Sequence, residues 1–173
     1  KNINWVLNFK SSSGPLDKGI FVGYPIILKD DQVVVTSDRN TYVHNAKNAT
    51  KVWHQSIPSI KKPIATNNNI FAITKNNFLI CMDINSGEIL WSTNIYNQID
   101  KKKKKLGYVK DFVISENIIL VFTSNGYFIS VNYKNGKLIS FKKPIRKGFI
   151  SKPIFVDGFI YALGSNNKLL KLE

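Results

Sequence analysis

The chain has 173 residues, of which 25 are basic and 11 acidic, so its formal net charge is +14. A hydrophobic content of 43% is enough for one packed core of ordinary domain size, which excludes a disordered chain. The single cysteine, Cys81, excludes an internal disulfide, and no apolar run approaches the roughly 18 residues that a membrane-spanning helix needs.

One sequence unit recurs along the whole chain. Its four copies open at Pro25-Ile26, Pro63-Ile64, Phe112-Val113 and Pro153-Ile154, at successive spacings of 38, 49 and 41 residues. Each copy is rich in Ile, Val, Phe and Tyr and is interrupted by Asn, Asp, Ser and Gly, which predicts four short strands, A to D, joined by tight turns. Units of roughly 40 residues with four antiparallel strands are typical of propeller blades. The sequence therefore predicts an all-β fold, a β-propeller of four-stranded antiparallel blades.

The copies define the domain organisation in chain order. Residues 3–9 are expected to form strand D of a preceding blade, with Trp5 in the position that Trp53 and Trp91 hold in later copies. These indoles are expected to pack between neighbouring blades. Three blades and an incomplete final blade follow, at about 23–57, 61–96, 109–143 and 151–173.

About four blades are present, which predicts half of an eight-bladed ring. The other half would come from more chain or from a second copy in a homodimer. The alternative is that the chain closes on itself, the first strand pairing with the last three. Since the sequence begins at Lys1 and not at Met, it is interpreted as a mature, trimmed or excised piece.

The turn between strands C and D carries a resemblance to a known family. Asp83-x-x-Ser86-Gly87-x-Ile89-x-Trp91 resembles the repeat of quinoprotein-type propellers. The order of residues in 69–95, 124–137 and 152–173 resembles the C-terminal half of the BamB family of outer-membrane β-barrel assembly lipoproteins. The resemblance implies a non-enzymatic scaffold without a cofactor, located on the periplasmic face of the outer membrane. Its lipid-bearing Cys and signal peptide would lie upstream.

The resemblance also implies partners. They are the periplasmic domains of the central β-barrel assembly subunit, and unfolded outer-membrane proteins. In that family, loops between blades dock the partner, and one such loop corresponds to the residues before Pro25. The expected partner-binding residues are Asp17, Lys18, Ile20, Phe21 and Val22. Related chains carry acidic residues near positions 20 and 22, so the apolar tip here either docks on a partner or folds back over its blade.

Unfolded barrel proteins carry unpaired strands, so the outer strands D could bind them by adding a strand at the edge of a blade.

A run of five lysines lies between the second and third copies, and it is expected to be a solvated, mobile loop because like charges repel. The alternative is contact with an anionic surface through Lys101, Lys102, Lys103, Lys104 and Lys105. The same two interpretations apply to the net charge: unselected enrichment of lysine at solvated positions, or a positive field that attracts an anionic partner. Nucleic acid is not expected, because the lysines lack interleaved aromatic residues and only Arg39 and Arg146 are arginine.

Two other function classes fit the sequence less well. A degenerate quinoprotein dehydrogenase would resemble enzymes with a calcium site and often a Cys pair, but Cys81 is single and the acidic residues show no calcium-loop spacing. The two histidines, His44 and His54, lack zinc-site spacing. A non-catalytic propeller that acts as a sensor or interaction domain remains the second interpretation.

Overall fold

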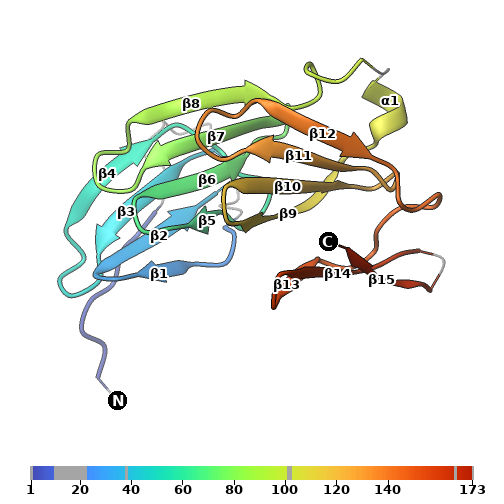
Figure 1. Ribbon diagram of the computed structural model, residues 1–173. Coiled ribbons are helices and arrows are strands. Elements are labelled where there is room, and N and C mark those ends of the chain that lie inside the picture. The colour runs from blue at the N-terminus through green and yellow to red at the C-terminus, as the bar shows by residue number, and fades with distance from the viewer. Residues whose placement is uncertain (1, 10–22, 38, 101–102, 166, 173) are drawn as a thin grey trace, which may run out of the picture. The chain divides into compact units, whose positions relative to one another are not determined.

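A computed structural model describes residues 2–9, 23–37, 39–100, 103–165 and 167–172 (Figure 1). The chain divides into two compact units, one of residues 1–75 and 80–90, and the other of residues 76–79 and 91–173. We call them unit 1 and unit 2 and describe each by itself. The described residues contain no helix long and apolar enough to span a membrane.

Four separate sheets follow one another along the chain, each with its strands side by side in sequence order. The first sheet consists of β1 (Ile27–Lys29), β2 (Gln32–Thr36), β3 (Thr41–Asn45) and β4 (Lys51–Gln55). The second consists of β5 (Ile64–Ala65), β6 (Asn69–Ile73), β7 (Phe78–Asp83) and β8 (Ile89–Asn94). The third consists of β9 (Val109–Ser115), β10 (Ile118–Thr123), β11 (Phe128–Asn132) and β12 (Leu138–Lys142). The fourth has three strands, β13 (Ile154–Val156), β14 (Phe159–Leu163) and β15 (Leu169–Leu172).

The predicted all-β class, with meandering four-stranded antiparallel sheets, is confirmed. The turns that join strands B and C use the left-handed backbone conformation that their residues predicted. Asn77 has a φ of 64°, Gly126 of 85° and Asn167 of 59°. Asparagine and glycine tolerate this conformation better than other residues, so the turn chemistry and the strand order agree.

The strand predicted at residues 3–9 is not present. Residues 2–9 form no strand and belong to none of the described sheets. Two aromatic side chains nevertheless hold the segment on the first sheet. The Trp5 indole Nε1 donates to the Ala46 carbonyl at 3.1 Å, and the Phe9 ring lies 5.0 Å from that of Tyr42.

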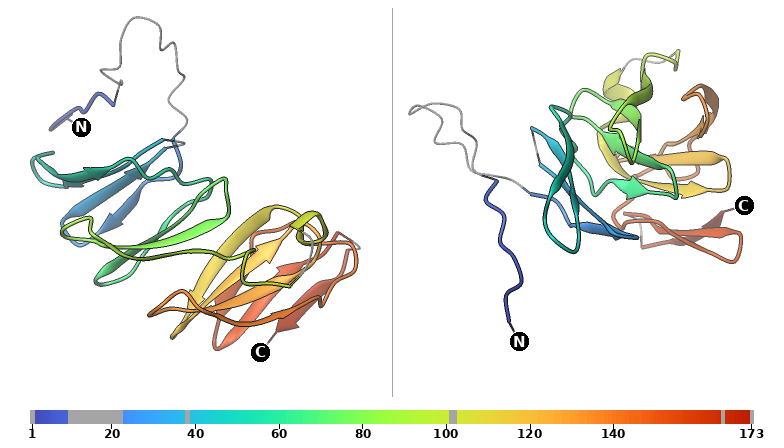
Figure 2. Two further views of the ribbon diagram at one scale, coloured as in Figure 1. Left: turned by 90° about the horizontal axis from the view of Figure 1, so that it is seen from above. Right: turned by 90° about the vertical axis from the view of Figure 1, so that its left-hand side faces the viewer.

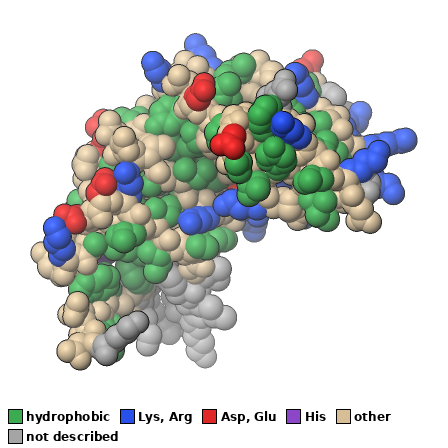
Figure 3. Space-filling model, turned by 60° about the horizontal axis from the view of Figure 1, so that its bottom comes forward, with side chains coloured by type: hydrophobic (Ala, Val, Ile, Leu, Met, Phe, Trp, Pro, Cys, Tyr) green, Lys and Arg blue, Asp and Glu red, His purple; other side chains and the backbone are tan. Residues whose placement is uncertain are grey.

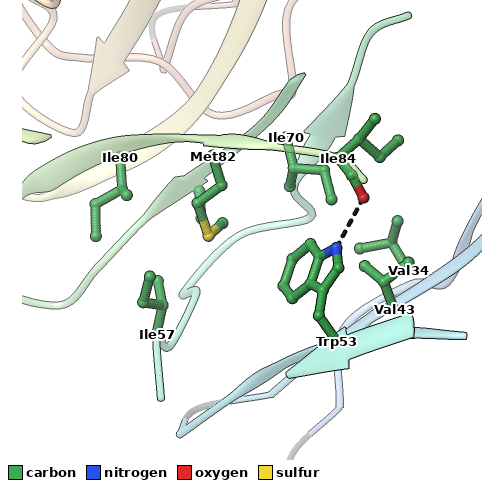
Figure 4. Close-up of a cluster of buried hydrophobic side chains, with 9 residues drawn as sticks. Val34, Val43, Trp53, Ile57, Ile70, Ile80, Met82 and Ile84 are labelled. Carbon is green, nitrogen blue, oxygen red and sulfur yellow. Dashed lines mark hydrogen bonds between the residues drawn. The ribbon is translucent and has the colours of Figure 1, made fainter. Parts of the chain in front are cut away.

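The core of unit 1 is a buried apolar cluster between the first sheet and residues of the second (Figure 4). Val34 and Val43 of the first sheet face Ile70 and Met82, and all four are fully buried. Trp53 lies between the two groups. At about 25 cal/mol per Å², the apolar area removed from water in such clusters is the main stabilising contribution to the fold.

Unit 2 has an equivalent core between the third and fourth sheets, which lie face to face (Figure 2). Phe122 is fully buried and meets Phe149 edge-on, at a centroid distance of 5.2 Å. Ile160 and Ala162 of β14 pack against this pair from the fourth sheet. One face of each sheet is thus buried by its neighbour, as expected for blades.

The tryptophans join successive copies through one repeated hydrogen bond. The Trp53 indole Nε1 donates to the Ile84 carbonyl at 2.8 Å, and that of Trp91 to the Tyr133 carbonyl at 3.1 Å. The Trp5 indole donates to the Ala46 carbonyl in the same way. In all three bonds the acceptor is the residue that directly follows a strand C, namely β3, β7 or β11. The prediction that Trp53 and Trp91 pack between neighbouring copies is confirmed.

The turn that receives each indole has the same internal structure in all three copies. A side-chain oxygen of Asn45, Asp83 or Asn132 accepts hydrogen bonds from the backbone N–H groups two and three residues further on. At the fifth residue the backbone turns left-handed, and Gly87 and Gly136 place no side chain against the indole. An added Cβ on Gly87 would lie 2.6 Å from Trp53 Cδ2.

We predict that Gly87→Ala destabilises the fold more than Gly158→Ala does. Both glycines have positive φ, which costs a side-chain-bearing residue about 1 to 2 kcal/mol. Only Gly87 would also press its Cβ into a buried indole, which adds about 1 to 3 kcal/mol, since Gly158 has no atom within 4 Å of that position. Urea unfolding followed by circular dichroism measures both losses, and equal losses would contradict the packing role of Gly87.

We further predict that Asp83→Ala costs about 1 kcal/mol, as loss of a capping acceptor does, whereas Asp83→Asn is nearly neutral. Asn45 and Asn132 already fill the equivalent positions. The hydrogen bond from the Ser86 backbone N–H is the largest cause that lowers the pKa of the Asp83 carboxyl. The stability that this carboxylate contributes is therefore complete above its unfolded-state pKa of about 3.9 and is lost as the pH falls through the lower folded-state pKa.

Urea unfolding at pH 7 and at pH 2.5 tests this sign. Asp83→Asn should lose less stability than the unchanged chain between the two pH values. A larger loss in Asp83→Asn would contradict the role of the carboxylate.

Candidate interaction surfaces

The residues predicted to bind a partner fall largely outside the described part of the chain. This applies to the whole apolar-tip segment, and to two residues of the lysine run: Asp17, Lys18, Ile20, Phe21, Val22, Lys101 and Lys102. The remaining lysines of the run, Lys103 to Lys105, begin the short helix α1 (Lys103–Leu106).

The prediction of a loop is wrong for residues 103–106, and two contacts explain the difference. Leu106 is fully buried, so the end of the lysine run is anchored in unit 2. The side-chain amide of Asn125 donates to the Lys105 carbonyl at 3.2 Å, and the Tyr96 hydroxyl donates to the Gly107 carbonyl at 2.9 Å. Charge repulsion among lysines does not prevent a helical turn whose far end is held in this way.

The turn formed by residues 124–126 contacts two of the connections between strands. On one side, the Ser124 N–H donates to the Tyr108 carbonyl at 2.8 Å, and the Tyr108 N–H donates back to Ser124 Oγ at 3.0 Å. These bonds and the one from Asn125 fasten the segment that carries Lys105. The basic helix is thereby attached to this turn through the backbone that follows its lysines.

The connection from β12 to β13 packs on the other side of the same turn. A Cβ on Gly148 would lie 1.8 Å from the Ser124 carbonyl oxygen, and one on Gly126 would lie 2.0 Å from the Ile145 carbonyl oxygen. Only glycine permits these approaches. Ser165 extends the network: its N–H donates to the Gly148 carbonyl at 2.9 Å, and its hydroxyl donates to the Lys147 carbonyl.

Three basic segments are therefore fixed around one turn. We define the basic end of unit 2 by its seven exposed cations: Lys105, Lys142, Lys143, Arg146, Lys147, Lys152 and Lys168. In Figures 1 and 2, α1, the connection after β12 and the turn before β15 lie at the same end of the sheets. Lys and Arg side chains gather at the right-hand side of Figure 3, where these segments lie.

The fourth sheet presents a second, apolar surface. Ile154 and Val156 of β13 are exposed, and Leu169 of β15 is 71% exposed. Tyr161 pairs with Ile154, so both lie on the face opposite to the buried Ile160 and Ala162. This face has the composition of a blade surface that normally receives a neighbour.

Metal-ligating side chains are not grouped in the described part of the chain. Among the described residues, no three His, Cys, Asp or Glu side chains form a group that could hold a metal ion. His44 is buried with Nδ1 3.0 Å from the Ala49 carbonyl, and His54 stacks on Tyr42 at 5.3 Å. Burial, and then the charge of Asp83, raises the pKa of the Cys81 thiol to about 12, so this thiol is not an activated nucleophile.

The described residues offer no grouped oxygen ligands for the calcium ion expected of a quinoprotein enzyme. Sequence reasoning associated that class with paired cysteines and grouped oxygen ligands. The chain has one cysteine, and its described acidic residues form no group of three potential ligands.

The sheets, their order and the tryptophan contacts define a β-propeller protein built from quinoprotein-like repeats. A family model described as "Outer membrane protein assembly factor BamB" matches residues 19–93. The chain is 24% identical over 96 residues to the outer membrane protein assembly factor BamB of Escherichia coli (strain K12), a match that covers 56% of this chain and 22% of that protein. The resemblance to the BamB family is thereby confirmed.

Solved structures show the same fold. The crystal structure of BamB from Moraxella catarrhalis superposes with a TM-score of 0.69 at 17% identity, over 86% of this chain and 45% of that one. A europium-containing methanol dehydrogenase matches with a TM-score of 0.54 at 15% identity, over 71% of this chain and 25% of that one. The chain thus spans less than half of the BamB structure, and the repeat fold is shared by an outer membrane protein assembly factor and a dehydrogenase.

Proposed function

We propose that this chain is a non-enzymatic scaffold in the assembly of β-barrel proteins, acting at the periplasmic face of the outer membrane. The match of residues 19–93 to the BamB family model, supported by the 24% identity to BamB of Escherichia coli, carries the proposal. The lack of grouped metal-ligating side chains among the described residues favours binding over metal-dependent chemistry such as that of the dehydrogenase relative. Membrane association would come from a lipid anchor upstream of this sequence.

The proposed partner is the central β-barrel assembly subunit, bound through its periplasmic domains. The contact would be made by the segment from Asp17 to Val22, where three consecutive apolar residues, Ile20, Phe21 and Val22, could enter a pocket on the partner. The exposed apolar face of β13 to β15 is proposed to receive a further blade, either from more chain or from a second copy.

We predict that replacing Ile20, Phe21 and Val22 together by Ser weakens binding to the purified periplasmic domains of the assembly subunit at least tenfold, because it removes the apolar anchor. Isothermal titration calorimetry measures the affinity. The matched control replaces Val52, Leu90 and Ile139 by Ser, since these are exposed apolar residues of β4, β8 and β12. Equal weakening in both variants, or no binding by the unchanged chain, would contradict the assignment.

Unfolded barrel proteins are the proposed clients, and the edges of the sheets are their proposed site. β4, β8 and β12 are edge strands, and each exposes an apolar residue beside its backbone: Val52, Leu90 and Ile139. An edge strand offers backbone N–H and C=O groups to any extended peptide, so recognition would not depend on the client's sequence.

We predict that a photo-crosslinker at Lys51 or Ser140, in strands β4 and β12, captures an unfolded barrel protein, and that one at Asn135, in a turn, captures much less. Backbone pairing would hold the client along the strand and away from the turn. Mass spectrometry of the crosslinked peptides locates the contact. Crosslinks confined to turns would refute binding at the edge strands.

A further inference from the structure

The two ends of the sheets in unit 2 differ sharply in charge. One end is the basic end of unit 2, with its seven exposed cations. The described carboxylates near this end are those of Asp100 and Asp111. The opposite end consists of the turns that join strands A to B and C to D. The charged residues of these turns are balanced, Lys134 and Lys137 against Glu116 and Asp157, and Lys171 of β15 extends over the Phe159 ring beside them.

The charge of the basic end is little neutralised within unit 2. The Lys152 ammonium group reaches a described carboxylate, that of Asp111, at a distance of 4.0 Å. Lys143 Nζ lies 4.9 Å from the centre of the Tyr127 ring, which a cation favours without losing its charge. Exposed like charges held together produce a positive field that reaches about 8 Å into solvent at physiological ionic strength.

The cations also have a fixed arrangement. Lys105 and Lys147 are attached to the turn at residues 124–126, through the Asn125 side chain and through the contact between Gly148 and Ser124. A bound surface would therefore meet several charges at once without first having to order the backbone that carries them.

Two exposed apolar side chains accompany the cations. Tyr108, which is bonded to the turn of residues 124–126, is 61% exposed, and Lys110 Nζ lies 5.4 Å from the centre of its ring. Ile150 is 52% exposed on the connection that carries Arg146 and Lys147. Tyrosine beside lysine is typical of residues at the membrane–water interface. Six of the seven cations are lysines. An ammonium group is a point charge that suits a phosphate group, whereas recognition of nucleic-acid bases favours the bidentate hydrogen bonds of arginine.

We propose that the basic end of unit 2 binds the surface of a membrane that contains anionic phospholipids. The lysines and Arg146 contact the phosphate groups, while Tyr108 and Ile150 enter the headgroup layer. This binding goes beyond the proposed scaffold function. It uses residues other than those proposed to dock the assembly subunit, so either proposal can fail without the other.

The test is sedimentation of the 173-residue chain with vesicles of phosphatidylcholine alone and with vesicles that also contain 30% phosphatidylglycerol. The unchanged chain should bind only the anionic vesicles, and less at 0.5 M NaCl. Replacing Lys105, Arg146 and Lys147 together by Gln should weaken this binding about tenfold to a hundredfold. The matched variant replaces Lys134, Lys137 and Lys171 by Gln, removes the same charge from the opposite end and should stay within about threefold.

Each other outcome overturns the proposal. Equal weakening in the two variants would mean that net charge alone drives binding. Equal binding to neutral vesicles, or none to anionic vesicles, would exclude recognition of lipid phosphate. Tighter binding to a single-stranded DNA oligonucleotide than to anionic vesicles, lost in the first variant only, would assign the surface to nucleic acid. Thermal unfolding monitored by circular dichroism verifies that both variants are folded.

Discussion

The contact on which the other features depend is the indole of one copy seated on the strand C to strand D turn of the next. A four-stranded sheet of this size has two apolar faces and can bury both only against neighbours. The indole supplies a large apolar surface, and its N–H bonds the carbonyl that follows strand C, so little polar cost remains. Gly87 and Gly136 let the ring lie flat on the turn. The same geometry recurs in unit 1 and in unit 2.

The connections between copies can therefore differ in length and sequence more than the strands and the C to D turns do. Stability depends on the strands, the tryptophans and the C to D turns. The connections that leave strand D are held at a few buried positions, among them Leu106, Gly148 and Phe149, and carry exposed lysines beside them. The longest described connection joins β8 to β9, and it holds α1 and most of the lysine run. A surface for binding can be built there without disturbing the packing between copies.

Much of this architecture could be predicted because the residues that recur in each copy are those that tight turns and the contact between copies require. Asn77 and Gly126 identify left-handed turns, and Trp53 and Trp91 identify the contact between copies. Two expectations were wrong for reasons that lie outside local sequence. Residues 3–9 have the composition of a strand, but a strand exists only where a partner takes up its hydrogen bonds. The charges of the lysine run alone predict a loop, but its helical turn depends on the burial of Leu106 and on Asn125, which is distant in sequence.

The basic end of unit 2 was missed for a related reason, although a signal for it existed. In an up-and-down blade, the B to C turns and the connections from D to the next A lie at one end, and the other turns lie at the opposite end. Sorting charges by connection type, and not by their position in the chain, separates Arg146, Lys147 and Lys168 from Glu116 and Asp157. Enrichment of lysine by mutation alone would load every solvated turn alike. The near balance at the opposite end of the same sheets therefore favours a positive field directed at an anionic surface over unselected accumulation of lysine.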